Sequence, residues 1–225
     1  FLKQHGLDPE KQTVTIATSS QESHLSRERL KAKHKRRLSS LEQTGDYLKI
    51  VENHKILRNV VEDFLKTSPS QYPDLNFVLK PHPHENAVYW KQLIEKLGNA
   101  NLALSLGHPI NDLLSCSDLH IAYNVCTTTV EAGLAGVPNV EIQTKNSKLL
   151  YAREHLELPK YRATCAEELD PLISKELLAA SSQKKRSNSI SSPKLKEYIT
   201  HYLHKFDGNR CQAYAEFIDE WHESN

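Results

Sequence analysis

The segment "LHIAYNVCTTTVEAGLAGVPNVEIQT", residues 119–144, decides the fold that the sequence predicts. It begins with the apolar run LHIAYN, continues with three threonines that open a helical stretch, and closes with the β-branched run NVEIQT. Gly136 and Pro138 mark the end of the helix, because glycine suits the position after a helix and proline cannot continue one. A strand, a helix and a strand joined by short links predict two parallel strands with the helix on one face of the sheet.

The same alternation continues on both sides of this segment. The run TVTIATS is rich in β-branched residues, which favours a strand near the start of the chain. Residues 45–69 carry apolar side chains at helical spacing, and we expect Pro69 to end that helix. Gly98 is the expected stop of a further helix. The predicted strands cover 13–19, 75–80, 102–106, 119–124, 139–144 and 161–165, and the other predicted helices cover 85–98, 127–136 and segments near 110–116, 147–157 and 167–179.

This alternation predicts an α/β fold, a Rossmann-like doubly wound parallel sheet with helices on both faces, plus C-terminal helices. We expect residues 1–180 to form this domain. The serine-rich, basic segment 181–193 lacks periodicity, which predicts a flexible linker or loop. Residues 194–225 predict two terminal helices that pack back on the domain.

The composition narrows the class of protein. Hydrophobic residues make up 38% of the 225 residues, and the net charge of +1 predicts no nucleic-acid partner. The mean hydropathy is −0.58, and no apolar run approaches the roughly 20 residues of a membrane helix. The four cysteines form no CxxC pair, which disfavours a zinc site and favours a reducing cytosol. Because the chain has no methionine and starts with Phe1, we expect it to be a piece of a longer protein.

Polar residues follow each of the first four predicted strands. In a parallel sheet the carboxyl ends of the strands meet at one edge, where doubly wound proteins bind their ligands. The sequence therefore predicts that these loops converge on one site. Their residues are Thr18, Ser19 and Ser20 after the first strand, Lys80, His82 and His84 after the second, Gly107, His108 and Pro109 after the third, and Asn124, Cys126, Thr127, Thr128 and Thr129 after the fourth.

Thr127, Thr128 and Thr129 stand where a helix begins after a buried strand. Thr127 or Thr128 can serve as the N-cap of that helix. The unpaired amides and the positive dipole end of the helix would hold a phosphate together with the hydroxyls. Helix capping alone is the other interpretation, but three consecutive hydroxyls favour a ligand.

The loop that contains "KPHPH", residues 80–84, places a histidine between two prolines. The prolines hold the backbone extended and so fix where His82 points. An imidazole with a pKa near neutrality suits phosphate binding or proton donation to a leaving group, and Lys80 adds a positive charge for phosphate. A solvated loop histidine is the alternative for His82, and we expect His84 to be a capping or surface residue. The basic stretch 27–37 predicts a solvated helix face or, alternatively, a loop that closes over an anionic ligand.

The order and spacing of these motifs resemble the C-terminal, nucleotide-sugar-binding domain of GT-B fold glycosyltransferases, in particular the bacterial surface-polysaccharide and capsule enzymes with an HP motif. The resemblance covers residues 1 to about 220. It rests on FLKQHGLDPEKQTVTIATS at the entry to the domain, LKPHPHE as the HP motif, SCSDLHIAYNVCTTTVEAGLAGVPNVEI as the phosphate motif with its helix, and FDGNRCQAYAEFI as the closing helix.

The resemblance implies roles for the matching positions. For Glu131, a solvent-facing position on the helix stays open as the alternative to the ribose-binding role that the resemblance implies. No DxD motif stands in an obvious loop, so neither a metal nor a further cofactor is expected beside the nucleotide-sugar substrate. The matching positions are His82 for the donor phosphate and the departing group, Thr127, Thr128 and Thr129 for phosphate oxygens, Glu131 for ribose hydroxyls, and Gly107 and His108 for the base.

The resemblance also implies a function and partners. The chain would be the donor-binding half of a glycosyltransferase that moves a sugar or a polyol phosphate from a nucleotide donor to a surface-glycan acceptor. Its partners would be a nucleotide sugar and a glycan or lipid-linked acceptor. The protein would act in the cytoplasm, and peripheral attachment to the inner membrane through a missing region stays open as a further expectation. We expect little activity without an acceptor domain. A UDP-sugar 2-epimerase-like enzyme and a non-catalytic nucleotide-binding or interaction module are the alternatives.

Overall fold

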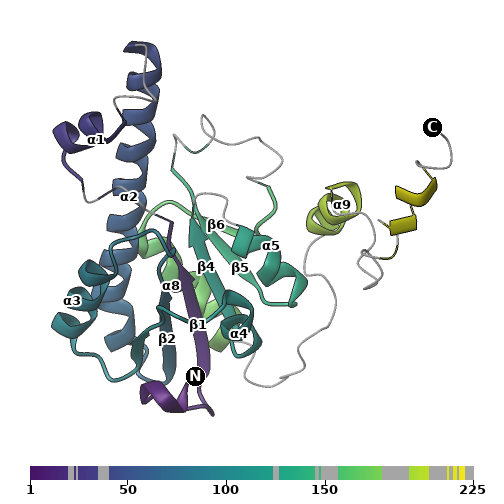
Figure 1. Ribbon diagram of the computed structural model, residues 1–225. Coiled ribbons are helices and arrows are strands. Elements are labelled where there is room, and N and C mark those ends of the chain that lie inside the picture. The colour runs from purple at the N-terminus through teal and green to yellow at the C-terminus, as the bar shows by residue number, and fades with distance from the viewer. Residues whose placement is uncertain are drawn as a thin grey trace.

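A six-stranded parallel sheet forms the centre of the molecule (Figure 1). The computed structural model describes residues 1–19, 23, 25–34, 41–123, 127–144, 147, 157–178, 193–202, 212, 215–216 and 218–220. Its strands run in the order β3-β2-β1-β4-β5-β6, so the order reverses between β1 and β4. This is the strand order of the doubly wound Rossmann fold, and the predicted fold class is confirmed. The strands are β1 (Gln12–Ala17), β2 (Leu75–Lys80), β3 (Leu102–Leu104), β4 (Leu119–Tyr123), β5 (Asn139–Ile142) and β6 (Tyr161–Ala163).

Helices connect the first five strands in succession, as the sequence predicts. In Figure 1, α4 and α5 lie in front of the sheet and α8 lies behind it. In the part of the chain that the structure describes, every helix is too short or too polar to cross a membrane. The α-helices are α1 (Arg27–His34), α2 (Leu41–Gln71), α3 (Ala87–Leu97), α4 (Ile110–Ser115), α5 (Thr127–Leu134), α8 (Leu169–Ile173) and α9 (Pro193–Tyr202), and the short helices are η1 (Lys3–His5), η2 (Ala166–Glu168) and η3 (Ser174–Leu178).

One face of the sheet is apolar and carries the main core. Alternate strand residues such as Val14, Phe77 and Ile121 point to this face and are fully buried there. They pack against apolar side chains of α2, α3, α8 and η3, with Phe64 and Phe77 in an edge-on ring contact at 6.0 Å. Burial of this surface is the main force that holds the helices on the sheet.

The opposite face is polar beneath α5. Asn139 donates from Nδ2 to the Thr129 carbonyl at 2.9 Å, and the Thr129 hydroxyl donates to Glu141 Oε2 at 2.7 Å. Strand β5 thereby holds α5 by hydrogen bonds rather than by apolar packing alone. The buried polar side chains of the strands on this face are Thr13, Thr15, Asn76, His120, Asn139 and Glu141.

Helix α2 continues past Pro69, so the prediction that this proline ends the helix is wrong. The backbone N–H of Tyr72 still donates to the Ser68 carbonyl at 2.9 Å, which carries the last turn across the proline. The side chain of Asn101 then donates to the carbonyls of Pro69, Tyr72 and Leu75 at 2.9–3.1 Å. This amide, which is distant in sequence, satisfies carbonyls that a helix end leaves unpaired.

Other helix ends follow the sequence closely. Gly98 ends α3 with a φ of 63°, and Gly136 follows α5 with a φ of 70°. Both values lie in the left-handed region that favours glycine. The predicted N-caps of α5 differ from the structure, because Thr127 is already the first residue of the helix. Three predictions fall wholly or largely on residues outside the described ranges, namely the helix near 147–157, the linker 181–193 and the second terminal helix.

Helix α9 packs on α5 through a close contact at Gly133. Leu195 and Ile199 of α9 are buried against Val130 and Leu134 of α5. A Cβ atom added at Gly133 would lie 1.9 Å from Leu195 Cδ2, far inside contact distance. The absence of a side chain at Gly133 therefore allows the two helices to meet.

We expect Gly133→Ala to destabilise the protein by about 1–2 kcal/mol. Overpacking a closed contact costs about 1–3 kcal/mol, and better helix propensity returns up to about 1 kcal/mol. Urea unfolding followed by circular dichroism measures the change. Gly107→Ala is the matched control, because nothing lies within 4 Å of its added Cβ. Leu195→Ala in the Gly133→Ala background should relieve the clash, and a Gly133→Ala variant as stable as the parent would contradict the argument.

Candidate functional site

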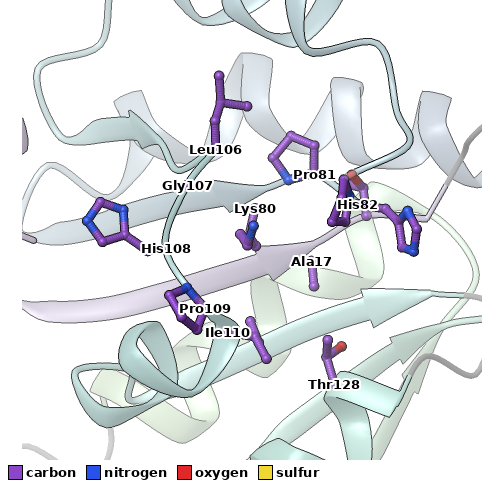
Figure 2. A pocket seen from close by; sticks show the side chains of 12 residues that line it. Ala17, Lys80, Pro81, His82, Leu106, Gly107, His108, Pro109, Ile110 and Thr128 are labelled. Carbon is purple, nitrogen blue, oxygen red and sulfur yellow. The ribbon is translucent and has the colours of Figure 1, made fainter.

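A pocket of about 370 Å³ opens at the carboxyl ends of β1 and β2, beside the point where the strand order reverses (Figure 2). It is lined by the last residues of β1 and β2, by the loop after β3 and by the starts of α4 and α5, as the predicted convergence of the loops requires. Of the candidate residues, the pocket brings together Lys80, His82, Gly107, His108 and Thr128. Its complete lining is Ala17, Thr18, Lys80, Pro81, His82, Pro83, Leu106, Gly107, His108, Pro109, Ile110 and Thr128.

His82 is held in one tautomer by its own loop. Its Nδ1 accepts a hydrogen bond from the backbone N–H of His84 at 3.1 Å, so the neutral ring carries its proton on Nε2. Burial lowers the pKa of His82 below its usual value, and the neighbouring charges of His84 and Lys80 lower it further. At neutral pH the ring is therefore uncharged and acts as an Nε2–H donor.

Lys80 is the last residue of β2 and lines the same pocket. Burial lowers the pKa of its ammonium group. No carboxylate in the described ranges forms an ion pair with it. A half-buried cation without a counter-charge favours an anion in the pocket, because charge neutralisation would offset its desolvation.

Glu85 anchors the histidine loop, a role that the sequence does not reveal. Its Oε2 accepts from the Thr18 hydroxyl at 2.8 Å and from the Trp90 indole Nε1–H at 2.5 Å. Its backbone N–H donates to the His82 carbonyl at 2.8 Å. This buried carboxylate thus connects the end of β1, the histidine loop and α3. A carboxylate three residues after His82 is the only sequence signal for this anchor.

Thr128 is half-buried and presents its side chain to the pocket from the start of α5. Figure 2 shows it on the far side of Ala17 from Lys80 and His82. Its hydroxyl lies 3.0 Å from Nε2 of His120, a fully buried residue of β4. Sequence analysis does not single out His120, because it sits inside an apolar strand pattern.

The other candidate residues of α5 lie outside the pocket lining. Thr127 is exposed, and Thr129 is buried with its hydroxyl on Glu141. Glu131 lies one helical turn from Thr127 and Thr128, on the same side of α5. Its Oε2 is buried and has no hydrogen-bond partner in the described structure. Burial raises the pKa of this carboxyl group.

His108 belongs to the pocket wall, but its ring extends away from Lys80 and Thr128 (Figure 2). It meets the rings of Phe1 and His5 edge-on, with centroids 4.9 and 5.7 Å away. The first residues of the chain thereby support the loop after β3. Gly107 and the apolar residues beside it complete this wall.

The pocket combines two kinds of surface. Lys80, His82 and Thr128 supply a cation, an imidazole N–H and a hydroxyl, which suit a phosphate. Ala17, Leu106, Pro109 and Ile110 supply an apolar wall, which suits a flat uncharged group. The arrangement can hold a molecule that is anionic at one end and apolar at the other. Within the described ranges, no three His, Cys, Asp or Glu side chains gather where they could hold a metal ion.

No protein-family model and no curated protein matches this chain. The solved structures that are similar to it include two with low sequence identity. The S. aureus MnaA–UDP co-structure is 11% identical with a TM-score of 0.48, over 90% of this chain and 48% of that chain. The crystal structure of a GtfA/B complex is 13% identical with a TM-score of 0.46, over 95% of this chain and 37% of that chain. The chain thus spans less than half the length of either.

Proposed function

We propose that this chain binds a nucleotide sugar as the donor half of a GT-B glycosyltransferase. The reaction would move a sugar, or a polyol phosphate, from the nucleotide to a surface-glycan acceptor. The observation that carries the proposal is the placement of Lys80, His82 and Thr128 around one pocket at the carboxyl edge of the sheet. Lys80 supports an anionic ligand most directly, because its charge has no counter-charge in the described ranges.

Each of these groups has a role in the proposed complex. The Lys80 ammonium and the His82 Nε2–H would hold phosphate oxygens from one side, and the Thr128 hydroxyl with the first amides of α5 would hold them from the other. Cleavage of the bond to the sugar leaves added negative charge on the departing phosphate. Donors that are already in place stabilise that charge without reorganisation.

Glu131 supports the position of a ribose in the same proposal. Its buried Oε2 lacks a donor in the described structure, and burial already raises the pKa of the group. The side chain as a whole is only half-buried, so a pair of ribose hydroxyls one turn along α5 from the phosphate would donate to its accessible part rather than to Oε2. The carboxylate would then gain hydrogen bonds that favour its charged form.

Calorimetric titration with UDP, CDP, GDP and CMP tests donor binding. We expect one of these nucleotides to bind in the micromolar range. His82→Ala and Thr128→Val should each weaken that binding, the first by about 10- to 100-fold because it removes a hydrogen bond to a charged group. His84→Ala is the matched control: it keeps the backbone N–H that orients His82, so binding should persist. A folded protein that binds none of the four nucleotides would refute the proposal.

A product assay separates transfer from other chemistry on the same donor. The longest available form of the protein is incubated with the sugar nucleotide that matches the bound base, with and without a glycan acceptor. Transfer predicts free nucleotide and an extended glycan only when the acceptor is present. An epimerised sugar nucleotide without acceptor would identify the 2-epimerase-like alternative instead.

A further inference from the structure

We infer that Thr18 is a specificity-determining residue that accepts a hydrogen bond from a carbohydrate hydroxyl of the ligand. The hydroxyl belongs to the ribose or to the transferred sugar, two parts of a nucleotide sugar that share this chemistry. The inference rests on the proposed function, because it names what the same site recognises beside the phosphate.

The place of Thr18 in the fold brings it close to the proposed phosphate position. Thr18 follows directly on β1 and lines the pocket together with Lys80. Its backbone N–H donates to the Lys80 carbonyl at 3.1 Å, which extends the pairing in which Ala17 lies opposite Lys80. The backbone of Thr18 is thereby fixed beside the strand end that carries the Lys80 cation. A ligand group that meets Thr18 therefore lies near the phosphate.

Both hydrogen-bond donors of Thr18 are already in use. The backbone N–H is bound to Lys80, and the hydroxyl donates to Glu85 Oε2 at 2.8 Å. The indole N–H of Trp90 donates to the same Oε2 at 2.5 Å. Because an indole N–H can only donate, this carboxyl oxygen is an acceptor, and the Thr18 hydroxyl proton points to it. Thr18 can therefore offer a ligand only the lone pairs of its hydroxyl oxygen.

The Thr18 oxygen can accept a further hydrogen bond. A hydroxyl oxygen has two lone pairs, and no N–H or O–H of the described residues donates to it. Thr18 is almost fully buried, so a donor reaches it only from within the pocket. A site that offers a buried hydrogen-bond partner to a ligand hydroxyl discriminates strongly against the analogue that lacks the hydroxyl.

An acceptor at this place favours a hydroxyl over a phosphate oxygen. Phosphate oxygens carry lone pairs and negative charge, and the Glu85 carboxyl group lies directly behind the Thr18 hydroxyl. In a nucleotide sugar, the ribose and the transferred sugar are bonded to the phosphates, whereas the base is separated from them by the ribose. A carbohydrate hydroxyl is therefore the donor that lies nearest to a phosphate held by Lys80.

Calorimetric titration of Thr18→Val tests the inference with three ligands. They are the nucleotide that binds the parent protein, its 2′,3′-dideoxy form and its nucleotide sugar. We expect Thr18→Val to bind the ligand with the recognised hydroxyl roughly fivefold more weakly, the effect of one hydrogen bond. A loss for the ribonucleotide that is absent for the dideoxy form assigns the hydroxyl to the ribose. A loss confined to the nucleotide sugar assigns it to the transferred sugar.

Two further variants control this titration. Thr18→Ser keeps the hydroxyl and should bind all three ligands as the parent protein does. Thr67→Val is the matched control, because the Thr67 hydroxyl donates to the Asp63 carbonyl within α2, away from the pocket. Circular dichroism and thermal unfolding show which variants are folded. Equal losses for all three ligands in Thr18→Val, or no loss for any of them, would overturn the inference.

Proton NMR of the free protein gives a second readout, which remains even if Thr18→Val fails to fold. The Thr18 hydroxyl proton and the Trp90 indole proton point to the same carboxyl oxygen, so we expect a nuclear Overhauser effect between them. A hydroxyl proton that lacks this contact, or that exchanges too fast to be detected at low temperature, would contradict the acceptor role of Thr18.

The outcomes separate this inference from the proposed function. If a nucleotide binds the parent protein and His82→Ala weakens that binding, but Thr18→Val binds all three ligands as the parent does, only the role of Thr18 fails. If the folded parent protein binds no nucleotide, the proposed function fails, and the inference fails with it.

Discussion

Glu85→Ala is expected to destabilise the fold by about 3 kcal/mol and to lower the midpoint of thermal unfolding by about 10 °C. The alanine removes the acceptor of two buried donors, the Thr18 hydroxyl and the Trp90 indole N–H. Thr18 is 3% exposed and Trp90 is 2% exposed, so water cannot replace the lost carboxylate. A buried donor left without a partner costs about 1–3 kcal/mol.

The same substitution should weaken nucleotide binding, because the histidine loop depends on this anchor. Thr18 and Trp90 come from different parts of the fold, and the Glu85 side chain connects both of them to the loop of His82. Urea unfolding measures the stability change, and calorimetric titration measures the affinity.

Glu85→Gln is the matched control for this prediction. Both donors share one carboxylate oxygen, Oε2, and the glutamine carbonyl can replace that oxygen. We therefore expect Glu85→Gln to keep most of the stability that Glu85→Ala loses. Equal losses in the two variants would show that the negative charge, rather than the acceptor geometry, stabilises this loop.

Lys80→Met should bind nucleotide about 10- to 100-fold more weakly while the fold becomes slightly more stable. The affinity falls because a charge-assisted hydrogen bond to phosphate is worth about 1.5–3 kcal/mol. The fold gains because burial lowers the pKa of Lys80, which means that the folded protein penalises the charged form. Methionine has a similar length and no charge to bury.

The pH dependence of stability gives an independent check on Lys80. Because its pKa is lowered in the folded state, the unfolded chain binds more protons between that lowered pKa and 10.5. In that alkaline window, Lys80 should make stability rise with pH, and Lys80→Met should remove this contribution. Lys11→Met is the charge-matched control: Lys11 Nζ donates to the Pro73 carbonyl in an exposed position, away from the pocket. A loss of affinity as large in Lys11→Met as in Lys80→Met would contradict a specific role.

Much of the candidate site follows from strand order alone. Parallel strands bring their carboxyl ends to one edge, so residues after the first three strands and the threonines after the fourth were expected to meet. Lys80, His82 and Thr128 do line one pocket. The glycines were equally informative about the backbone, as the left-handed Gly98 and Gly136 show.

The residues that sequence analysis missed are buried polar groups. His120 lies within an apolar strand pattern, and nothing in that pattern shows which face of the sheet it points to. Glu85 lies beside a helix start, where surface carboxylates are common. The direction of a threonine hydroxyl depends on where the helix begins and how it is turned, so Thr128 and Thr129 could not be told apart. The prediction that Pro69 ends α2 was wrong because Asn101, about 30 positions later, supplies the donors at the true end of the helix.

The residues on the two faces of the sheet should vary in different ways among relatives of this protein. On the apolar face, residues of similar volume can replace one another at a cost below about 1.5 kcal/mol, so positions such as Phe77 and Leu79 are free to drift separately. Beneath α5, a change at Thr129 removes a hydrogen bond from the buried carboxylate of Glu141. Substitutions there should be tolerated best when both partners change together. We expect these two positions to covary among relatives, whereas Phe77 and Leu79 vary independently of both.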